Sequence, residues 1–153
     1  METPRKPSPA FIGASWLALF LGALGFSIGL WNATMPLSTK GLFFTLLMYG
    51  LFSAISVQKA VRDRLENVPV TPIYYGLSWV SVLLCLVLTA VGLWNAPITL
   101  AEKGFYSMAY LLSLFAAITV QKNTRDSAGL PQPAVLPTVP EPELPGPGGF
   151  RPL

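Results

Sequence analysis

The sequence contains one segment twice, and this duplication limits the folds open to the chain more than any other feature. Residues 29–63 align with residues 92–126 without a gap, and 17 of the 35 positions are identical. The correspondence continues upstream, where the pair Ser15-Trp16 aligns with Ser78-Trp79. Tandem copies of about 50 residues are typical of a structural unit that packs against its own neighbour. The chain is therefore expected to consist of two related units.

Long uncharged segments predict that both units lie in a membrane. Of 153 residues, 52% are hydrophobic and 11% are charged, against about 25% charged in typical globular proteins. No charged residue occurs within 11–39, 41–58, 73–101 or 104–121. A helix in water carries charge on its exposed face every turn or two, so uncharged runs of this length indicate that lipid is the solvent.

The predicted fold class is an all-α membrane protein with four transmembrane helices, arranged as two tandem parallel helical-hairpin repeats. The expected spans are 11–31, 42–57, 73–94 and 104–120. The first gives about 31 Å of helix, which matches a hydrocarbon core of about 30 Å. It is too long for the apolar region of a signal peptide and has a counterpart in the second copy, so it is expected to be retained. Short connections place each second helix antiparallel beside the first.

Five parts follow along the chain: a leader at 1–10, a two-helix repeat at 11–63, a linker at 64–72, a second repeat at 73–126 and a tail at 127–153. Thr99 and Glu102 fit a capping box that opens the last span.

Eight of the 27 tail residues are proline, which favours a disordered or polyproline-like segment. The PxxP spacing of Pro137 and Pro140 offers the alternative of a partner ligand.

The distribution of basic residues predicts the orientation. Seven lysines and arginines close to the membrane fall in the leader, around the linker and at the start of the tail, whereas the hairpin loops hold only Lys40 and Lys103. The seven are Arg5, Lys6, Lys59, Arg62, Arg64, Lys122 and Arg125. The positive-inside rule then places both termini and the linker in the cytoplasm. An even number of spans in each copy makes the repeats parallel rather than inverted.

Three motifs recur at the membrane surfaces. Gly-Leu-Trp-Asn-Ala closes the first and third spans, Lys-Gly opens the second and fourth, and Gln-Lys-x-x-Arg-Asp ends the second and fourth. The candidate interfacial residues are Trp31, Asn32, Lys40, Gln58, Lys59, Arg62, Asp63, Trp94, Asn95, Lys103, Gln121, Lys122, Arg125 and Asp126. The tryptophans suit the aromatic belt at the membrane surface. The alternative for Asn32 and Asn95 is that they pair across a pseudo-twofold axis or bind a small ligand.

The basic residues of these motifs have two interpretations each. Lys40 and Lys103 are expected to reach toward lipid phosphates, or to contact the neighbouring Asn. The Gln-Lys-x-x-Arg-Asp ends are expected to anchor the helices at anionic head groups, with weak pairs four residues apart, Lys59 with Asp63 and Lys122 with Asp126. A docking site made from both copies is the alternative.

Small residues recur at the four-residue spacing that lets membrane helices approach closely. The candidate packing pairs are Gly25 with Gly29, Gly50 with Ala54, and Ser113 with Ala117.

The repeated motifs, together with Glu-Lys-Gly-Phe-Tyr at 102–106 and Leu-Phe-Ser-Ala at 51–54, resemble the YiaA/YiaB family of bacterial inner-membrane proteins, in the form in which its two-helix domain occurs twice. The resemblance covers about residues 10–127. The first copy departs from the motif at 38–42, where it lacks an acidic residue equivalent to Glu102, and the proline-rich tail is not a recognised family feature. The resemblance implies an inner-membrane location and brings no activity, substrate or catalytic residue.

The residues themselves predict no enzyme, cofactor or metal site. Histidine is absent, Cys85 is the only cysteine, and there is no nucleophile beside a base and no phosphate-binding glycine loop. No basic stripe points to nucleic acid. The expected function is a structural or accessory membrane protein that packs against itself or a membrane partner within the bilayer. The alternative is a small channel or transporter, although the spans lack the embedded carboxylate that proton-coupled carriers use.

Overall fold

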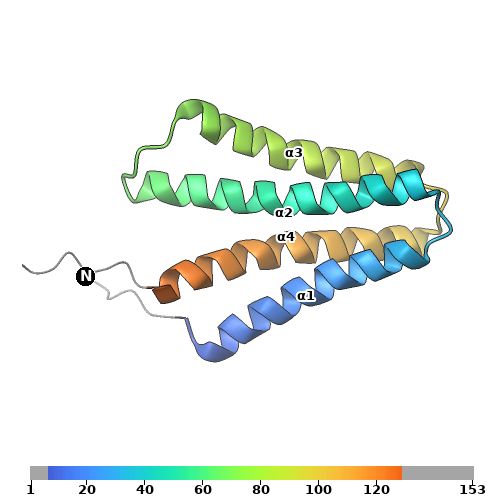
Figure 1. The fold of residues 1–153 in the computed structure, drawn as a ribbon, viewed down its shortest axis with the longest axis horizontal. Coiled ribbons are helices and arrows are strands. Elements are labelled where there is room, and N and C mark those ends of the chain that lie inside the picture. The colour runs from blue at the N-terminus through green and yellow to red at the C-terminus, as the bar shows by residue number, and fades with distance from the viewer. Residues whose placement is uncertain (1–6, 129–153) are drawn as a thin grey trace, which may run out of the picture.

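The computed structural model describes residues 7–128, and these residues form four long helices joined by short turns (Figure 1). The helices are α1 (Pro9–Asn32), α2 (Leu37–Leu65), α3 (Pro72–Asn95) and α4 (Leu100–Ala128). Each is long and apolar enough to cross a membrane, so the predicted fold class is confirmed. Most of the leader and the tail beyond Ala128, including the Pro137–Pro140 spacing, lie outside the described residues.

The first helix of each copy begins in the same way. Ser8 and Thr71 are the N-cap residues of α1 and α3, and each side-chain oxygen accepts a hydrogen bond from the backbone N–H three residues later, at 3.3 and 3.4 Å. A proline follows each cap, where its missing N–H costs nothing. The two copies thus share the signal that starts their first span.

The last helix opens with the predicted capping box. The Glu102 N–H donates to Thr99 Oγ1 at 3.3 Å, and the Thr99 N–H donates to Glu102 Oε2 at 2.7 Å. The equivalent helix of the first copy, α2, follows Pro36 and has no side-chain cap. The capping box is therefore present in the second copy only, in agreement with the sequence.

Helix α2 extends well past the span predicted at 42–57. Its 29 residues measure about 43 Å, so its charged last two turns project beyond a hydrocarbon core of about 30 Å. The helix ends at Leu65, and Asn67 just beyond it adopts the left-handed conformation with φ 59°. The Val68 N–H donates to the Asp63 carbonyl at 2.8 Å, which is the bond that closes a Schellman motif.

The helices pack mainly across the two copies rather than within them. Viewed side by side, the order is α3, α2, α4, α1, with both hairpin turns at one end and the linker at the other (Figure 1). The most extensive contacts join α1 to α4 and α2 to α3, and those within the hairpins are few. The repeats are parallel, and a pseudo-twofold axis runs between α2 and α4. The expected antiparallel return of each hairpin is confirmed, but the main packing partner comes from the other copy.

Aromatic side chains packed against another aromatic ring or against a small residue explain this preference. Phe26 of α1 lies edge-on to Tyr106 of α4, with ring centroids 5.4 Å apart, and is fully buried. We call the α1–α4 and α2–α3 contacts the two seams. In the α2–α3 seam, Phe43 of α2 packs against Gly92 of α3, where an added Cβ would lie 3.1 Å from the phenyl ring. Such pairs bring the backbones of helices from different copies into close contact.

Candidate functional site

A cluster of ion pairs joins the ends of α2 and α4, next to the linker. Arg62 contacts Asp126 at 2.7 Å, and Arg125 contacts Asp63 at 2.9 Å. The two pairs are equivalent, because Arg62 and Asp63 occupy the same positions in the first copy as Arg125 and Asp126 in the second. The repeated Arg-Asp motif therefore forms a reciprocal clasp across the pseudo-twofold axis.

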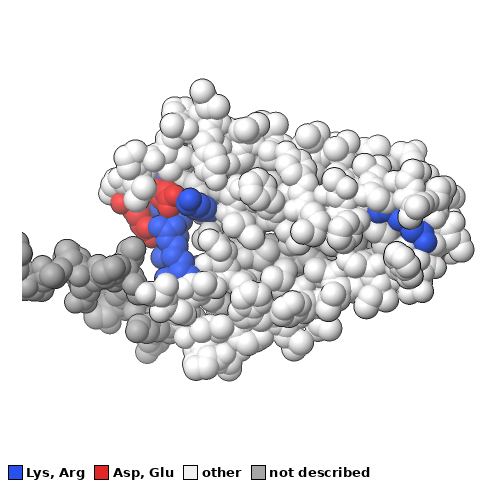
Figure 2. Space-filling model, in the orientation of Figure 1, with Lys and Arg blue, Asp and Glu red and all other residues white. Residues whose placement is uncertain are grey.

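Glu66 completes this clasp and breaks its symmetry. Its carboxylate accepts from Arg62 Nε and from an Arg125 terminal nitrogen, each at 2.7 Å. The cluster of Arg62, Asp63, Glu66, Arg125 and Asp126 thus holds two positive and three negative groups. Figure 2 shows charged side chains gathered at this end of the molecule, with a smaller basic patch at the opposite end and uncharged residues between. The fork of a guanidinium suits contacts with two carboxylates at once.

The predicted local pairs of this motif are wrong. Asp63 and Asp126 face an arginine of the other copy, and neither Lys59 nor Lys122 forms an ion pair within 4.0 Å among residues 7–128. A guanidinium makes two oriented hydrogen bonds to carboxylates, whereas a flexible ammonium four residues away gains only a few tenths of a kcal/mol. Gln121 is partly buried in the same turn of α4.

At the opposite end, each Lys-Gly motif caps the helix before it. Lys40 Nζ donates to the Trp31 carbonyl at 2.8 Å, and Lys103 Nζ donates to the Trp94 carbonyl at 2.7 Å. These carbonyls lie in the last turn of α1 and α3, where no intrahelical partner remains and a positive charge is favourable. This contact explains why Lys occurs twice near a helix start, where its charge opposes the helix dipole.

The two asparagines of the Trp-Asn motif do not pair with each other. Asn32 Nδ2 donates to the Ile28 carbonyl at 2.9 Å, and Asn95 Nδ2 donates to the Val91 carbonyl at 2.8 Å. The interpretation as a pair across the axis is therefore wrong, because each amide finds an acceptor in its own helix. Asn32 also lines a small hollow of about 370 Å³ with Glu102 and Tyr106.

The predicted packing residues lie between helices of different copies. Gly29 of α1 faces Phe105 and Tyr106 of α4, and Gly25 lies near the Phe105 ring. Gly50 of α2 contacts the hydroxyl of Tyr110 in α4. Ala54, Ser113 and Ala117 are buried.

Sequence reasoning missed Gly22, which lies directly against the backbone of α4. A Cβ at Gly22 would lie 2.6 Å from Ser113 Oγ and 2.9 Å from the Ser113 backbone nitrogen. The spacing of the glycines could have identified it. Gly22 lies three residues before Gly25 and seven before Gly29, so all three glycines share one face of the helix.

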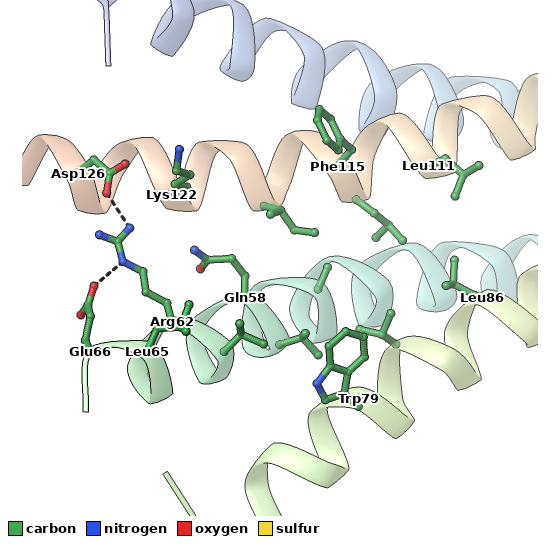
Figure 3. A pocket seen from close by; sticks show the side chains of 16 residues that line it. Gln58, Arg62, Leu65, Glu66, Trp79, Leu86, Leu111, Phe115, Lys122 and Asp126 are labelled. Carbon is green, nitrogen blue, oxygen red and sulfur yellow. Dashed lines mark hydrogen bonds and ion pairs between the residues drawn. The ribbon is translucent and has the colours of Figure 1, made fainter. Parts of the chain in front are cut away.

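A groove of about 820 Å³ begins at the clasp and runs along α2, α3 and α4 toward the middle of the molecule (Figure 3). Its walls are mostly apolar, and polar side chains occur only at the clasp end. The apolar lining is Ala54, Val57, Val61, Leu65, Trp79, Val82, Leu86, Leu111, Leu114, Phe115 and Ile118. The polar lining is Gln58, Arg62, Glu66, Lys122 and Asp126. Since Phe115 is 71% exposed and Leu111 is 53% exposed, the groove opens toward lipid.

Four apolar helices with a charged clasp at one end define a multi-pass membrane protein. The model of the yiaA/B two-helix domain matches residues 11–63 and again residues 74–126, so the chain belongs to this family.

Its relatives are also membrane proteins. The chain is 52% identical over 126 residues to inner membrane protein YiaA of Escherichia coli, covering 82% of this chain and 86% of that one. It is 29% identical to inner membrane protein YiaB of Escherichia coli over 100 residues, 65% of this chain and 84% of that one. It is 34% identical to the uncharacterized membrane protein YubF of Bacillus subtilis over 64 residues, 41% of this chain and 74% of that one. No solved structure matches the chain. The protein is thus a multi-pass inner-membrane protein.

Proposed function

We propose that the protein is a structural or accessory component of the inner membrane that acts by packing its helices against a second copy or another membrane protein. One observation carries this proposal: glycines recur at equivalent positions where the described chain packs nothing against them. A Cβ added at Gly13, Gly41, Gly76 or Gly104 would meet no atom within 4 Å. Gly13 corresponds to Gly76, and Gly41 corresponds to Gly104.

These outward glycines differ from those used inside the molecule. Gly22, Gly29 and Gly50 each lie against a side chain of another helix, which accounts for their small size. A helical glycine is less favourable than alanine by about 0.5–1 kcal/mol, so an outward glycine present in both copies supports an external contact. Small residues on a lipid-facing surface let a second helix approach closely.

The test is to replace the outward glycines in pairs and measure association. Native membranes are treated with a crosslinker, and the detergent-extracted protein is sized by light scattering. The unmodified protein should give a discrete oligomer or complex, and Gly13→Leu with Gly76→Leu, or Gly41→Leu with Gly104→Leu, should weaken it. Ala90→Leu is the matched control, because Ala90 is an exposed small residue of α3 that lies 14 residues, or about 21 Å of helix, from Gly76. Recovery of a partnerless monomer from membranes would overturn the proposal.

We further propose that the clasp end, with both termini, faces the cytoplasm. Lys59, Arg62, Arg64, Lys122 and Arg125 lie toward this end, against Lys40 and Lys103 at the other, and this imbalance supports the orientation. In a Cys85→Ser background, Thr34→Cys should react with an impermeant maleimide added outside intact spheroplasts. Asn67→Cys should react only after permeabilisation. The reverse pattern would overturn the orientation.

We also propose that the protein neither transports solutes nor catalyses a reaction. The packing between α2 and α4 supports this, since Tyr110 donates to the Leu46 carbonyl at 3.1 Å and lies with the buried Phe43 and Leu47 in one core. Within residues 7–128, no three His, Cys, Asp or Glu side chains are grouped to hold a metal ion. Liposomes containing the protein should retain ions and small solutes, and a leak dependent on the protein would contradict the proposal.

A further inference from the structure

The groove beside the clasp has the length of one membrane leaflet rather than of a whole bilayer. Along α4 its lining extends from Leu111 to Lys122, which corresponds to about 17 Å of helix. Half of a hydrocarbon core of about 30 Å is about 15 Å. A transmembrane partner helix needs a seam along the full core, whereas the acyl chain of a lipid fills one leaflet. The dimensions of the groove therefore fit a lipid.

The polar end of the groove contains one unpaired cation. Figure 3 shows Arg62 placed between Glu66 and Asp126, so its charge is already engaged, with Lys122 close by on α4. Lys122 forms no ion pair among residues 7–128. Its ammonium group is suited to a phosphate at the head-group level.

The same end also contains an unpaired acceptor. The Gln58 side-chain oxygen is inaccessible to solvent and has no hydrogen-bond partner in the described part of the chain. A buried amide oxygen without a donor is unfavourable, so the site favours a molecule that supplies an N–H or O–H group. The carboxylates of Glu66 and Asp126 line the groove beside Gln58, and their negative charges favour a cationic donor over a neutral one.

We propose that this groove binds a phospholipid with a primary-amine head group, of the phosphatidylethanolamine type. The acyl chain lies between α3 and α4 against Trp79 and Phe115, and the phosphate contacts Lys122. The ammonium group lies beside the carboxylates of the clasp and donates to the Gln58 oxygen, which rotation of the side-chain amide turns toward the groove. A choline head group has no N–H to donate, and a glycerol head group leaves the lipid with a net negative charge beside the clasp. This inference does not rest on the proposed association with other proteins.

The chain provides a matched pair of probes for the test. Trp79 lines the groove, and Trp16 is its equivalent in the other copy; their exposed fractions are 41% and 42%. Two single-tryptophan variants, each with the other three tryptophans changed to Phe, are reconstituted in phosphatidylcholine vesicles. Increasing fractions of phosphatidylethanolamine or phosphatidylglycerol with brominated acyl chains are added, and quenching of fluorescence is recorded.

Trp79 should reach half-quenching at a brominated phosphatidylethanolamine fraction at least roughly tenfold lower than Trp16, as expected for one charge-assisted hydrogen bond. Lys122→Gln and Gln58→Leu should each abolish the difference, whereas Lys59→Gln, which changes the lysine equivalent to Lys122, should leave it. Equal quenching of both tryptophans would overturn the proposal, since it indicates bulk lipid only. Preference for phosphatidylglycerol would overturn the amine head group. Protection of Trp79 from every brominated lipid would show that a protein segment fills the groove and would also overturn the proposal.

Discussion

Arg62 of the first copy and Asp126 of the second lie 2.7 Å apart, and the equivalent residues Arg125 and Asp63 make the same contact in the opposite direction. One dipeptide, present twice in the sequence, thus joins the ends of the two central helices. The arrangement makes each copy the ionic partner of the other.

This relationship predicts a coupling between residues 64 positions apart. In a double-mutant cycle of Arg62→Gln and Asp126→Asn, we expect a coupling free energy of about 0.5–1 kcal/mol, measured by thermal unfolding in detergent, because both side chains are about a quarter exposed. The control cycle pairs Lys122→Gln with Asp126→Asn, four residues apart on one helix, and its coupling should be close to zero. A larger coupling in the control would show that the local pair predominates.

The close approach of Gly22 to Ser113 predicts a strong size limit in the α1–α4 seam. Gly22→Ala should lower the free energy of unfolding by about 1–3 kcal/mol, because the new methyl overlaps the serine side chain and backbone. Adding Ser113→Gly should restore part of this loss. In the α2–α3 seam, Cys85 is the equivalent of Gly22 and Gly50 is the equivalent of Ser113, so that seam already combines a larger residue with a glycine. Gly25→Ala is the control and should not destabilise the protein, because its added Cβ would lie 3.9 Å from the Phe105 ring, an ordinary van der Waals distance. An unchanged stability of Gly22→Ala would mean that the seam is looser than described.

The lysines that cap the preceding helices should stabilise the hairpin turns. Lys40→Met removes the donor to the Trp31 carbonyl and is expected to cost about 1 kcal/mol, with faster amide hydrogen exchange in the turn that follows α1. Lys103→Met should have the same effect after α3. Lys59→Met changes an exposed lysine at the other end and should not alter exchange in either turn. Equal exchange in all three variants would argue against the capping role.

Asn123 should tolerate a change to alanine. It is 1% exposed, and its amide nitrogen donates to Ser15 Oγ at 3.0 Å, but its amide oxygen has no partner. Asn123→Ala loses about 0.6 kcal/mol for a hydrogen bond between membrane helices and also removes a buried unpaired oxygen, so the net change should be small. The second seam already has alanine at the equivalent position, Ala60, which is also buried. A loss above about 2 kcal/mol would show that the Asn123–Ser15 bond organises the helices.

The sequence allowed the four spans, the duplication and the family to be predicted, because lipid excludes charge over lengths that are visible in one chain. The capping box at Thr99 was equally accessible, since it depends on residues three positions apart. The partner of Asp63 could not be predicted in this way. The rule that residues four apart pair with each other considers only one helix, whereas Arg125 contacts Asp63 from a different helix, α4. The groove was also beyond sequence reasoning, because its lining comes from three helices whose relative register no local pattern specifies.

The exchange of partners between the two copies affects how the chain is assembled. The second hairpin ends 63 residues after the first. Helix α1 therefore finds its main neighbour, α4, only after that second hairpin has been synthesised. At about 5–20 residues per second, the ribosome leaves the first hairpin in the bilayer for roughly 3–13 s before Ser113 can meet Gly22. During that interval the glycine face of α1 is covered only by lipid, so the earliest membrane intermediate is a hairpin with an open seam that the rest of the chain later closes.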